Sequence, residues 1–208
     1  MLIAESGSTK TDWVLVRSDS SQEQFHTMGF NPFFHNEATV EKGIRENDGL
    51  YKLATEITHV YFYGAGCSSK DLNAVIERGL GQVFHNAKVS VNHDLLACAL
   101  ATYDGEPSIS CILGTGSNSC YFNGETLSEE VPALGYVLGD ETLLDRARNQ
   151  ARELLRGGPS KVALVVASDA VDIPVSEATS DVVTVRKAID EIELGHRADR
   201  LPEAIARA

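Results

Sequence analysis

The sequence has 208 residues, enough for one large domain or two small ones, and 43% of them are hydrophobic, as is usual for globular proteins. Its formal net charge of -12 at pH 7 argues against nucleic acid and an anionic membrane surface as partners, because an acidic surface repels both. No apolar run approaches the roughly 18 residues needed to cross a bilayer, and the first residues do not resemble a signal peptide. We therefore expect a soluble, cytoplasmic protein with two domains.

The first part of the chain predicts alternating strands and helices. Strands at 2–6 and 11–18 flank a short loop and are expected to form a hairpin, with a third strand at 24–30. Hydrophobic spacing then predicts, in chain order, a helix at 37–56, a strand at 58–67, a helix at 69–84 that begins near Ser69, a strand at 87–92 and a helix at 93–103. This alternation is typical of an α/β fold with a partly parallel sheet.

The pattern begins again at residue 108. The stretch SISCILGTGSNSCYFNGE, residues 108–125, predicts two strands joined by a loop, and Asn123-Gly124 predicts a turn. This strand-loop-strand unit resembles the one at the start of the chain. We therefore expect a duplicated fold whose halves each present one loop to a shared cleft.

The composition changes after Glu141. All aromatic residues and all four cysteines lie before this point, and arginine replaces lysine as the main basic residue after it. The tail predicts a helix at 142–156, a strand at 161–168 and a helix within 185–194. We expect this strand to join the sheet begun at residue 108, since its apolar run must be buried. The tail is a shortened natural lobe, a fusion or an engineered chimera, and the change of composition favours the last two.

Two loops combine glycine with small hydroxyl-bearing residues directly after predicted strands: ESGSTKTDW at 5–13 and ILGTGSNS at 112–119. Glycine lets backbone N–H groups approach an anion, and Ser or Thr adds donors without bulk, so such loops suit phosphate groups. Neither loop matches the glycine motifs of P-loop or dinucleotide-binding proteins. Each loop alone is more often an ordinary turn, but the pair predicts that phosphates are bound from two sides.

Phosphoryl transfer to an alcohol needs Mg²⁺ and usually a group that accepts the hydroxyl proton. The carboxylates placed to serve are Glu5, Asp12, Asp94, Asp140 and Glu141. Asp94 stands where a predicted strand ends and a helix begins, which is where α/β folds place ligands. The alternative role of Asp94 is that of a helix N-cap, and the neighbouring His93 either orients a substrate or flanks that cap.

Six motifs occur in an order and spacing that closely resemble the N-acetylglucosamine kinase family: ESGSTKTDW, GFNPF, VYFYGAGC, NHDLLACALA, CILGTGSNSC and LGYVLGDE. The family belongs with the benzoyl-CoA reductase activator type ATPases to the sugar-kinase and actin-like superfamily. The resemblance covers residues 1 to about 141 and implies two ribonuclease-H-like lobes with ATP and sugar in the cleft between them. We therefore expect an α/β fold with one such lobe at 1–107 and a shortened or replaced second lobe at 108–208, in which 142–208 is atypical.

The resemblance also implies roles for single residues. The two phosphate loops are implied to consist of Gly7, Ser8, Thr9 and Lys10, and of Gly114, Thr115, Gly116 and Ser117. Asp94 is similar to the general base that takes the proton from the sugar 6-hydroxyl. The residues implied to contact the sugar are Asn31, Asp94, Thr115, Gly116 and Asp140. Glu5 stands where the family usually has the aspartate that helps to hold Mg²⁺, so we expect metal binding to be weakened.

These features lead to an expected function with open alternatives. The first expectation is ATP-dependent phosphorylation of N-acetylglucosamine or a related amino sugar at the 6-hydroxyl, with ATP and Mg²⁺ as cofactors. Because residues 142–208 lack a recognisable adenosine motif, we expect weak ATP affinity and reduced activity. The alternatives are a non-catalytic sugar or nucleotide binding module, and an engineered or fused fragment of such a kinase. Whether the chain forms a homodimer stays open.

Overall fold

The computed structural model describes residues 1–7, 9–113, 117–129, 148, 149, 152, 155, 156, 162–167 and 171–191. The chain divides into two compact units, Met1–Asp94 and Leu95–Ala208, which we describe separately. The division falls at the start of the helix that the sequence predicts at 93–103, whereas the predicted domain boundary lies at 107/108. Among the residues that the structure describes, no helix has the length and apolar character needed to cross a membrane.

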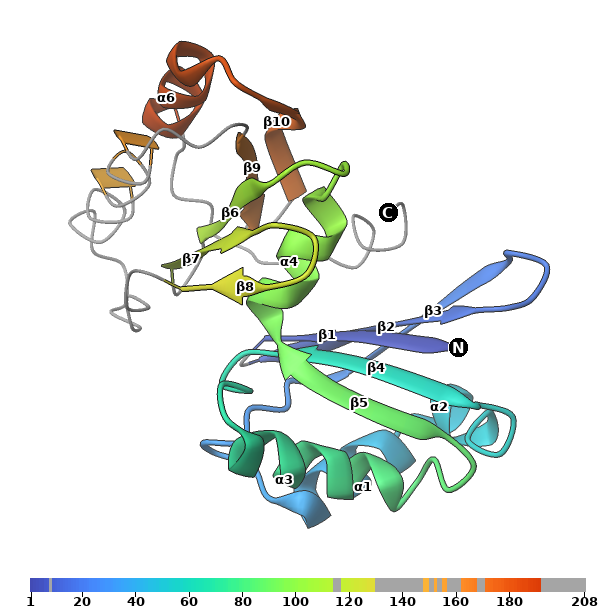
Figure 1. The fold of residues 1–208 in the computed structure, drawn as a ribbon. Coiled ribbons are helices and arrows are strands. Elements are labelled where there is room, and N and C mark those ends of the chain that lie inside the picture. Colours follow the sequence, from blue (N-terminus) through green and yellow to red (C-terminus); the bar gives the residue numbers. More distant parts are fainter. Residues whose placement is uncertain are drawn as a thin grey trace. The chain divides into compact units, whose positions relative to one another are not determined.

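The first unit is built on a five-stranded sheet (Figure 1). Its elements are β1 (Leu2–Ser6), β2 (Lys10–Val16), β3 (Gln22–Met28), α1 (Glu37–Arg45), α2 (Asp48–Lys52), β4 (His59–Gly64), α3 (Lys70–Gly81) and β5 (Lys88–His93). The strand order is β3-β2-β1-β4-β5, in which β1, β2 and β3 pair antiparallel and β1, β4 and β5 pair parallel. The predicted hairpin and the partly parallel sheet are therefore confirmed.

The core of this unit lies between the sheet and helices α1 and α3, which Figure 1 shows on one face of the sheet. Trp13 is fully buried at its centre, and its ring lies 6.1–6.5 Å from three other buried aromatic rings, those of Phe30, Phe62 and Phe84. The indole N–H donates to Thr27 Oγ1 at 2.9 Å, which satisfies the polar end of Trp13. Since side chains alternate along a strand, the neighbour Asp12 lies on the opposite face.

The predicted helix at 37–56 is in fact two shorter helices. The side chain of Asn36 accepts a hydrogen bond from Thr39 N–H at 3.0 Å and caps α1, and Asn47 accepts one from Leu50 N–H at 2.9 Å and caps α2. The second cap falls inside the hydrophobic spacing and starts a new helix there. The predicted cap at Ser69 is confirmed, because its Oγ accepts a hydrogen bond from Leu72 N–H at 3.3 Å.

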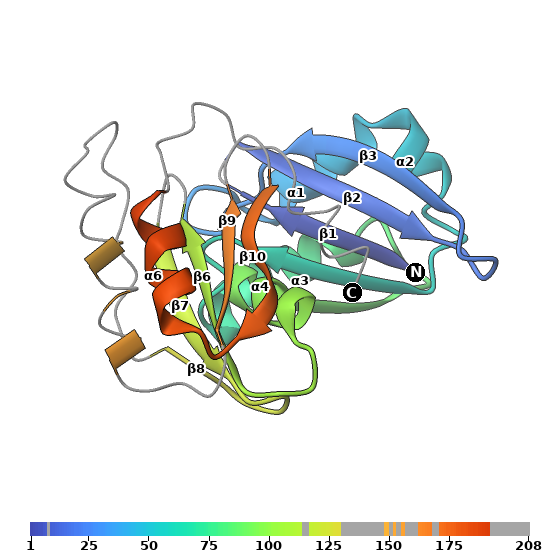
Figure 2. The ribbon, with the colours of Figure 1, turned by 90° about the horizontal axis from the view of Figure 1, so that it is seen from above.

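The second unit contains further short sheets (Figure 2). Its described elements are α4 (Asp94–Thr102), β6 (Ser108–Leu113), β7 (Ser117–Phe122), β8 (Leu127–Ser128), β9 (Val162–Ala167), β10 (Val171–Thr179) and α6 (Val182–Asp190). Strands β6, β7 and β8 form one antiparallel sheet, which confirms the predicted pair of strands joined by a loop. The predicted turn at Asn123-Gly124 is also present, with φ of +93° at Gly124.

The strand predicted at 161–168 is present as β9. It lies beside β6, the first strand of the sheet that it was expected to join (Figures 1 and 2), and among the described residues its hydrogen-bonded partner is β10. The sequence did not predict β10, which contains Pro174. Proline has no N–H to donate to a neighbouring strand, and the register of β10 against β9 shifts at this place, between Asp172 and Val175. Helix α6 confirms the last predicted helix, with an earlier start. The sequence also predicts a helix at 142–156. The described residues in this range are helical, namely 148, 149, 152, 155 and 156.

Candidate functional site

The parallel strands of the first unit end together at one edge of the sheet. Ser6 of β1 pairs with Gly64 of β4, and Gly64 pairs with His93 of β5, so these three residues mark the carboxyl ends of the strands. Asp94 follows directly as the first residue of α4. The carboxyl edge of a parallel sheet is the usual place for a ligand in α/β folds. Asp94 therefore has the location that the sequence predicts for it.

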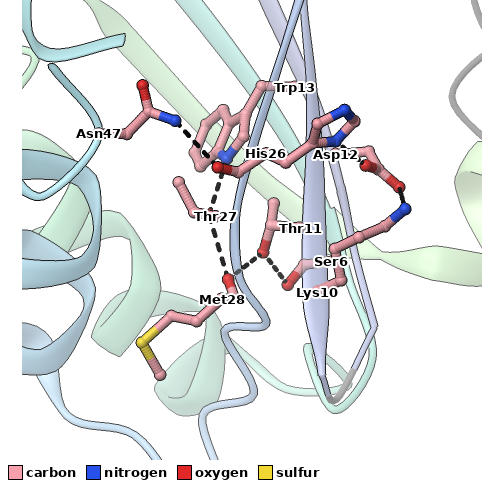
Figure 3. A network of polar contacts seen from close by, with 9 residues as sticks. All are labelled: Ser6, Lys10, Thr11, Asp12, Trp13, His26, Thr27, Met28 and Asn47. Atoms are coloured by element: carbon pink, nitrogen blue, oxygen red, sulfur yellow. Dashed lines mark hydrogen bonds and ion pairs between the residues drawn. The ribbon is translucent and has the colours of Figure 1, made fainter. Parts of the chain in front are cut away.

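Ser6 ties the loops at this edge together. It is fully buried; its Oγ accepts a hydrogen bond from Phe30 N–H at 2.8 Å, and its carbonyl oxygen accepts one from Ala65 N–H at 2.8 Å. Its hydroxyl also lies 2.7 Å from Thr11 Oγ1, which in turn donates to the carbonyl of Met28 at 2.9 Å (Figure 3). The chain after β3 and the chain after β4 are thereby both fixed to the end of β1.

Asn31 and Gly66 come into contact through this arrangement. Asn31 is 7% exposed, and its Oδ1 accepts a hydrogen bond from Phe33 N–H at 3.0 Å. Gly66 has φ of +82°, and a Cβ atom added to it would lie 2.6 Å from Asn31 Oδ1. A side chain at position 66 would therefore displace the amide of Asn31, the predicted sugar ligand. No pattern in the sequence indicates that these two positions meet.

A row of polar side chains crosses the sheet on the face opposite Trp13. Glu5 pairs with Asp12, which pairs with His26; in the other direction Glu5 pairs with Tyr63, which pairs with Asn92. Directly paired residues of neighbouring strands have their side chains on the same face, with Cβ atoms roughly 5 Å apart. We call these five residues the polar row. The row places two carboxyl groups side by side.

The charges near this edge influence one another. Burial, together with the negative charges of Asp94 and Asp12, raises the pKa of Glu5 from its ordinary value of 4.5 to about 8, and Lys10 opposes this rise. Burial and the charge of Asp94 also raise the pKa of the Cys67 thiol to about 12, so this thiol stays protonated. Glu5 is thus largely protonated at pH 7. The edge brings Glu5, Asp12, Lys10 and Asp94 into one electrostatic environment.

Asp12 binds two basic side chains (Figure 3). Its Oδ2 lies 3.0 Å from Lys10 Nζ, and its Oδ1 contacts His26 Nδ1. An ionised carboxylate only accepts hydrogen bonds, so His26 is the donor in this contact. Sequence reasoning missed His26; the register of the predicted hairpin and third strand was the signal that could have found it.

Asp94 has two predicted roles, general base and helix N-cap, and its surroundings bear on both. As the first residue of α4, its carboxylate lies near the amino end of the helix, where a negative charge is favourable. Its Oδ1 also lies 3.2 Å from His93 Nε2, and its side chain remains 20% exposed. A contact with His93 restricts the carboxylate while leaving part of it accessible. This arrangement is compatible with a proton acceptor at the helix start.

A backbone hydrogen bond joins the described residues of the first loop. Gly7 N–H donates to Lys10 O at 3.0 Å, and among the described residues the atom nearest to a Cβ atom added at Gly7 would be Lys10 O, at 3.8 Å. The N–H of Gly7 is therefore used within the loop, and Thr9 is exposed. Ser117 begins β7, and its side chain lies outside the described residues, as do the other predicted ligands: Ser8, Gly114, Thr115, Gly116 and Asp140.

The comparison with known proteins identifies the class of the fold. No family model and no curated protein matches the chain. Among solved structures, the chain resembles the inorganic polyphosphate/ATP-glucomannokinase of Arthrobacter sp. strain KM, with a TM-score of 0.50, 16% identity and coverage of 91% of this chain and 98% of that one. It also resembles the ethanolamine utilization protein EutJ of Carboxydothermus hydrogenoformans, with a TM-score of 0.54, 9% identity and coverage of 99% and 88%. The chain thus has the actin-like sugar-kinase fold.

A third structure is more similar in sequence. It is that of a candidate N-acetylglucosamine kinase from Porphyromonas gingivalis, with 37% identity, a TM-score of 0.62 and coverage of 76% of this chain. The chain spans 56% of the length of that protein. The six motifs indicate a resemblance to N-acetylglucosamine kinases. The similarity to this structure confirms that resemblance for the part of the sugar kinase that the chain spans.

Proposed function

We propose that the chain takes part in ATP-dependent phosphorylation of N-acetylglucosamine or a related amino sugar at its 6-hydroxyl. The observation that carries the proposal is Asp94, a partly exposed carboxylate at the carboxyl edge of the parallel strands. The 37% identity to a candidate N-acetylglucosamine kinase supports an amino sugar as the substrate. The name of the polyphosphate/ATP-glucomannokinase, which shares the fold, is in keeping with ATP as the phosphate donor.

In this mechanism Asp94 accepts the proton of the sugar 6-hydroxyl while the oxygen attacks the terminal phosphorus of ATP, and the bond from that phosphorus to the β,γ-bridging oxygen breaks so that ADP leaves. A general base must lie within hydrogen-bond reach of the proton that it takes. The contact with His93 at 3.2 Å restricts the orientation of the carboxylate. The negative charge of Asp94 contributes to the raised pKa values of Glu5 and Cys67, which shows that it acts on the other groups at this edge.

The sugar would be held from the first unit by Asn31. Its Oδ1 accepts a hydrogen bond within the chain from Phe33 N–H, which leaves the amide nitrogen as the group suited to donate to a sugar oxygen. Gly66 keeps space for this amide, because a side chain there would collide with it. Thr115, Gly116 and Asp140 are the further proposed sugar contacts.

The phosphates of ATP would be held by Lys10 with Ser8 and Thr9, and by the loop from Gly114 to Ser117. Mg²⁺ fits Glu5, because a divalent cation would stabilise the ionised carboxylate, whose pKa burial and the charges of Asp94 and Asp12 raise to about 8, and would neutralise charge on the phosphates. Among the described residues, no group of three or more His, Cys, Asp and Glu side chains is arranged to hold a metal. Mg²⁺ needs no such group, since it commonly binds one or two carboxylates and keeps several waters.

A non-catalytic sugar-binding module is the second candidate. The observation that favours it is the hydrogen bond from Gly7 N–H to Lys10 O, which uses within the loop an amide that an anion-binding loop would direct at a phosphate. Such a module would bind the sugar through Asn31 with little affinity for ATP. The two candidates differ in nucleotide binding and turnover.

The test is calorimetric titration of the full chain with N-acetylglucosamine and with ATP-Mg²⁺ separately, followed by a coupled assay for ADP. Asp94→Asn should lower turnover about a hundredfold while sugar affinity changes little. Asp71→Asn is the matched control, because Asp71 is an exposed aspartate in the first turn of another helix, α3. Sugar binding without ATP binding supports the module. Absence of both contradicts both candidates.

A further inference from the structure

Lys10 is restrained at both its backbone and its side chain. Its carbonyl oxygen accepts the hydrogen bond from Gly7 N–H that closes the loop, and its ammonium lies 3.0 Å from Asp12 Oδ2. A lysine side chain carries roughly 2 kcal/mol of rotamer entropy, so an unrestrained ammonium would sample many positions. The contact with Asp12 confines it to the polar face of β2, directly beside the loop.

Asp12 is itself held in place. Its side chain is 6% exposed, and the carboxylate oxygen that does not bind Lys10 contacts His26 of the adjacent strand (Figure 3). The carbonyl oxygen of His26 accepts a hydrogen bond at 2.9 Å from the side chain of Asn47, the N-cap of α2. The carboxylate is therefore fixed from one side by a strand that is tied to a helix, and it offers Lys10 a stationary partner.

The direct neighbour of Asp12 makes this arrangement unusual. Glu5 stands opposite Asp12 in β1, and burial together with the charges of Asp94 and Asp12 raises the pKa of Glu5 to about 8, so Glu5 is largely protonated at pH 7. The charge at position 12 therefore makes ionisation of its buried neighbour more costly, and an uncharged residue there would avoid this cost. The carboxylate of Asp12 gains its two basic contacts instead. Its orientation towards Lys10 is the feature that calls for a functional explanation.

We propose that Asp12, held by His26, is a positioning residue that keeps the Lys10 ammonium beside the first loop for contact with a nucleotide phosphate. The ammonium has three N–H donors, so it can contact Asp12 and a phosphate oxygen together. The choice of ligand rests on the proposed function, whereas the restraint of Lys10 by Asp12 does not. Asp12 touches no phosphate in this scheme and acts only through Lys10.

The test compares the full-length chain with its Asp12→Asn variant, which keeps the shape and removes the charge. The first measurement is the NMR order of the Lys10 side chain in lysine-labelled protein, assigned with Lys10→Gln. We expect a restricted ammonium in the original chain and a mobile one in the variant. The second is calorimetry with ATP-Mg²⁺, in which we expect the dissociation constant to rise about tenfold, or about 1.4 kcal/mol.

Two further variants separate positioning from a general loss of structure. His26→Gln changes a side chain that is 58% exposed, so the fold should persist, while Lys10 order falls and ATP affinity drops about threefold. Glu23→Gln is the matched control: it removes the exposed ion pair with Arg17 on the same strands and should change neither measurement. Asp12→Glu should restore part of the Lys10 order, because it restores the charge.

The outcomes distinguish this proposal from the proposed function. If Lys10 is as ordered in Asp12→Asn and His26→Gln as in the original chain, the positioning role is wrong. If Lys10 order falls as expected but the original chain binds no ATP, the positioning by Asp12 stands and the proposed function fails. If order falls and ATP affinity does not, Lys10 does not serve the nucleotide and the proposal is overturned.

Discussion

The loop after β1 and the loop after β4 lie at the same edge of the first sheet, and both contain glycine, yet they depend on it differently. Gly66 has φ of +82° and no room for a side chain, because Asn31 Oδ1 occupies that space. At Gly7, by contrast, the nearest atom that an added Cβ would meet among the described residues is Lys10 O, at 3.8 Å. The loop after β4 thus depends on its glycine, whereas the loop after β1 depends on Lys10 and Asp12.

The comparison has a physical meaning for the site. A glycine that is required by packing leaves space for a neighbouring side chain, here the amide of Asn31, the proposed sugar ligand. A glycine with space beside it leaves the chemistry to adjacent side chains. We therefore expect substitutions in the two loops to have effects of different kinds. Changes after β4 act through structure, and changes after β1 act through charge.

The largest effect is expected for Gly66→Ala. The left-handed backbone costs about 1–2 kcal/mol for alanine, and displacement of Asn31 adds about 1–3 kcal/mol. The free energy of unfolding in urea should fall by the sum of these two costs, and the affinity for N-acetylglucosamine should fall as well. Gly105→Ala is the control, since Gly105 has φ of +101° but nothing within 4 Å of its added Cβ, so it should show the backbone cost alone. Equal losses for the two variants would contradict the contact with Asn31.

An intermediate effect is expected for Glu5→Gln, and it depends on pH. The folded state raises the pKa of Glu5 from 4.5 to about 8, so between these values the folded chain binds a proton that the unfolded chain lacks. Its contribution to stability is present below about pH 4.5 and is lost as pH rises through 8. The glutamine variant should lose less stability than the original chain between pH 5 and 9.

Thermal unfolding across this pH range measures the difference. Glu23→Gln serves as the control because Glu23 is an exposed, ion-paired glutamate in β3, and its variant should follow the original chain. Added Mg²⁺ at pH 9 should stabilise the original chain more than Glu5→Gln, since only the ionised carboxylate attracts the cation. The same pH slope in the original chain and in Glu5→Gln would show that Glu5 is not the group that titrates.

The sequence predicted much of this region because its signals are local. The hairpin, the cap at Ser69 and the position of Asp94 at a strand end all follow from short stretches whose hydrophobic period or capping residue is visible. The polar row was not visible, because it depends on which residues face one another across five strands. The contact between Gly66 and Asn31 likewise joins positions that lie far apart in the chain.

Two departures show how local rules fail. Asn47 falls inside an otherwise helical spacing, and its side chain caps α2 instead of continuing α1, so one predicted helix became two. Strand β10 was missed because Pro174 argues against a strand, yet a strand with one paired side tolerates proline where its register shifts. In both cases hydrogen bonds that involve the backbone decided the local structure, and the hydrophobic pattern did not.

The smallest effect is expected for Gly7→Ala, and it tests the comparison most directly. Gly7 has no positive φ and enough space for a methyl group, so stability should change by less than about 0.5 kcal/mol, since the unfolded chain also loses freedom. The hydrogen bond from its N–H to Lys10 O persists in an alanine variant, and Lys10 should keep its contact with Asp12. ATP affinity, measured by calorimetry, should therefore stay within about twofold, a change of roughly 0.4 kcal/mol. A loss of ATP binding with an unchanged unfolding free energy would mean that a phosphate approaches the backbone at Gly7. In that case the loop after β1 would depend on its glycine as the loop after β4 does, and the distinction between these two loops would fail.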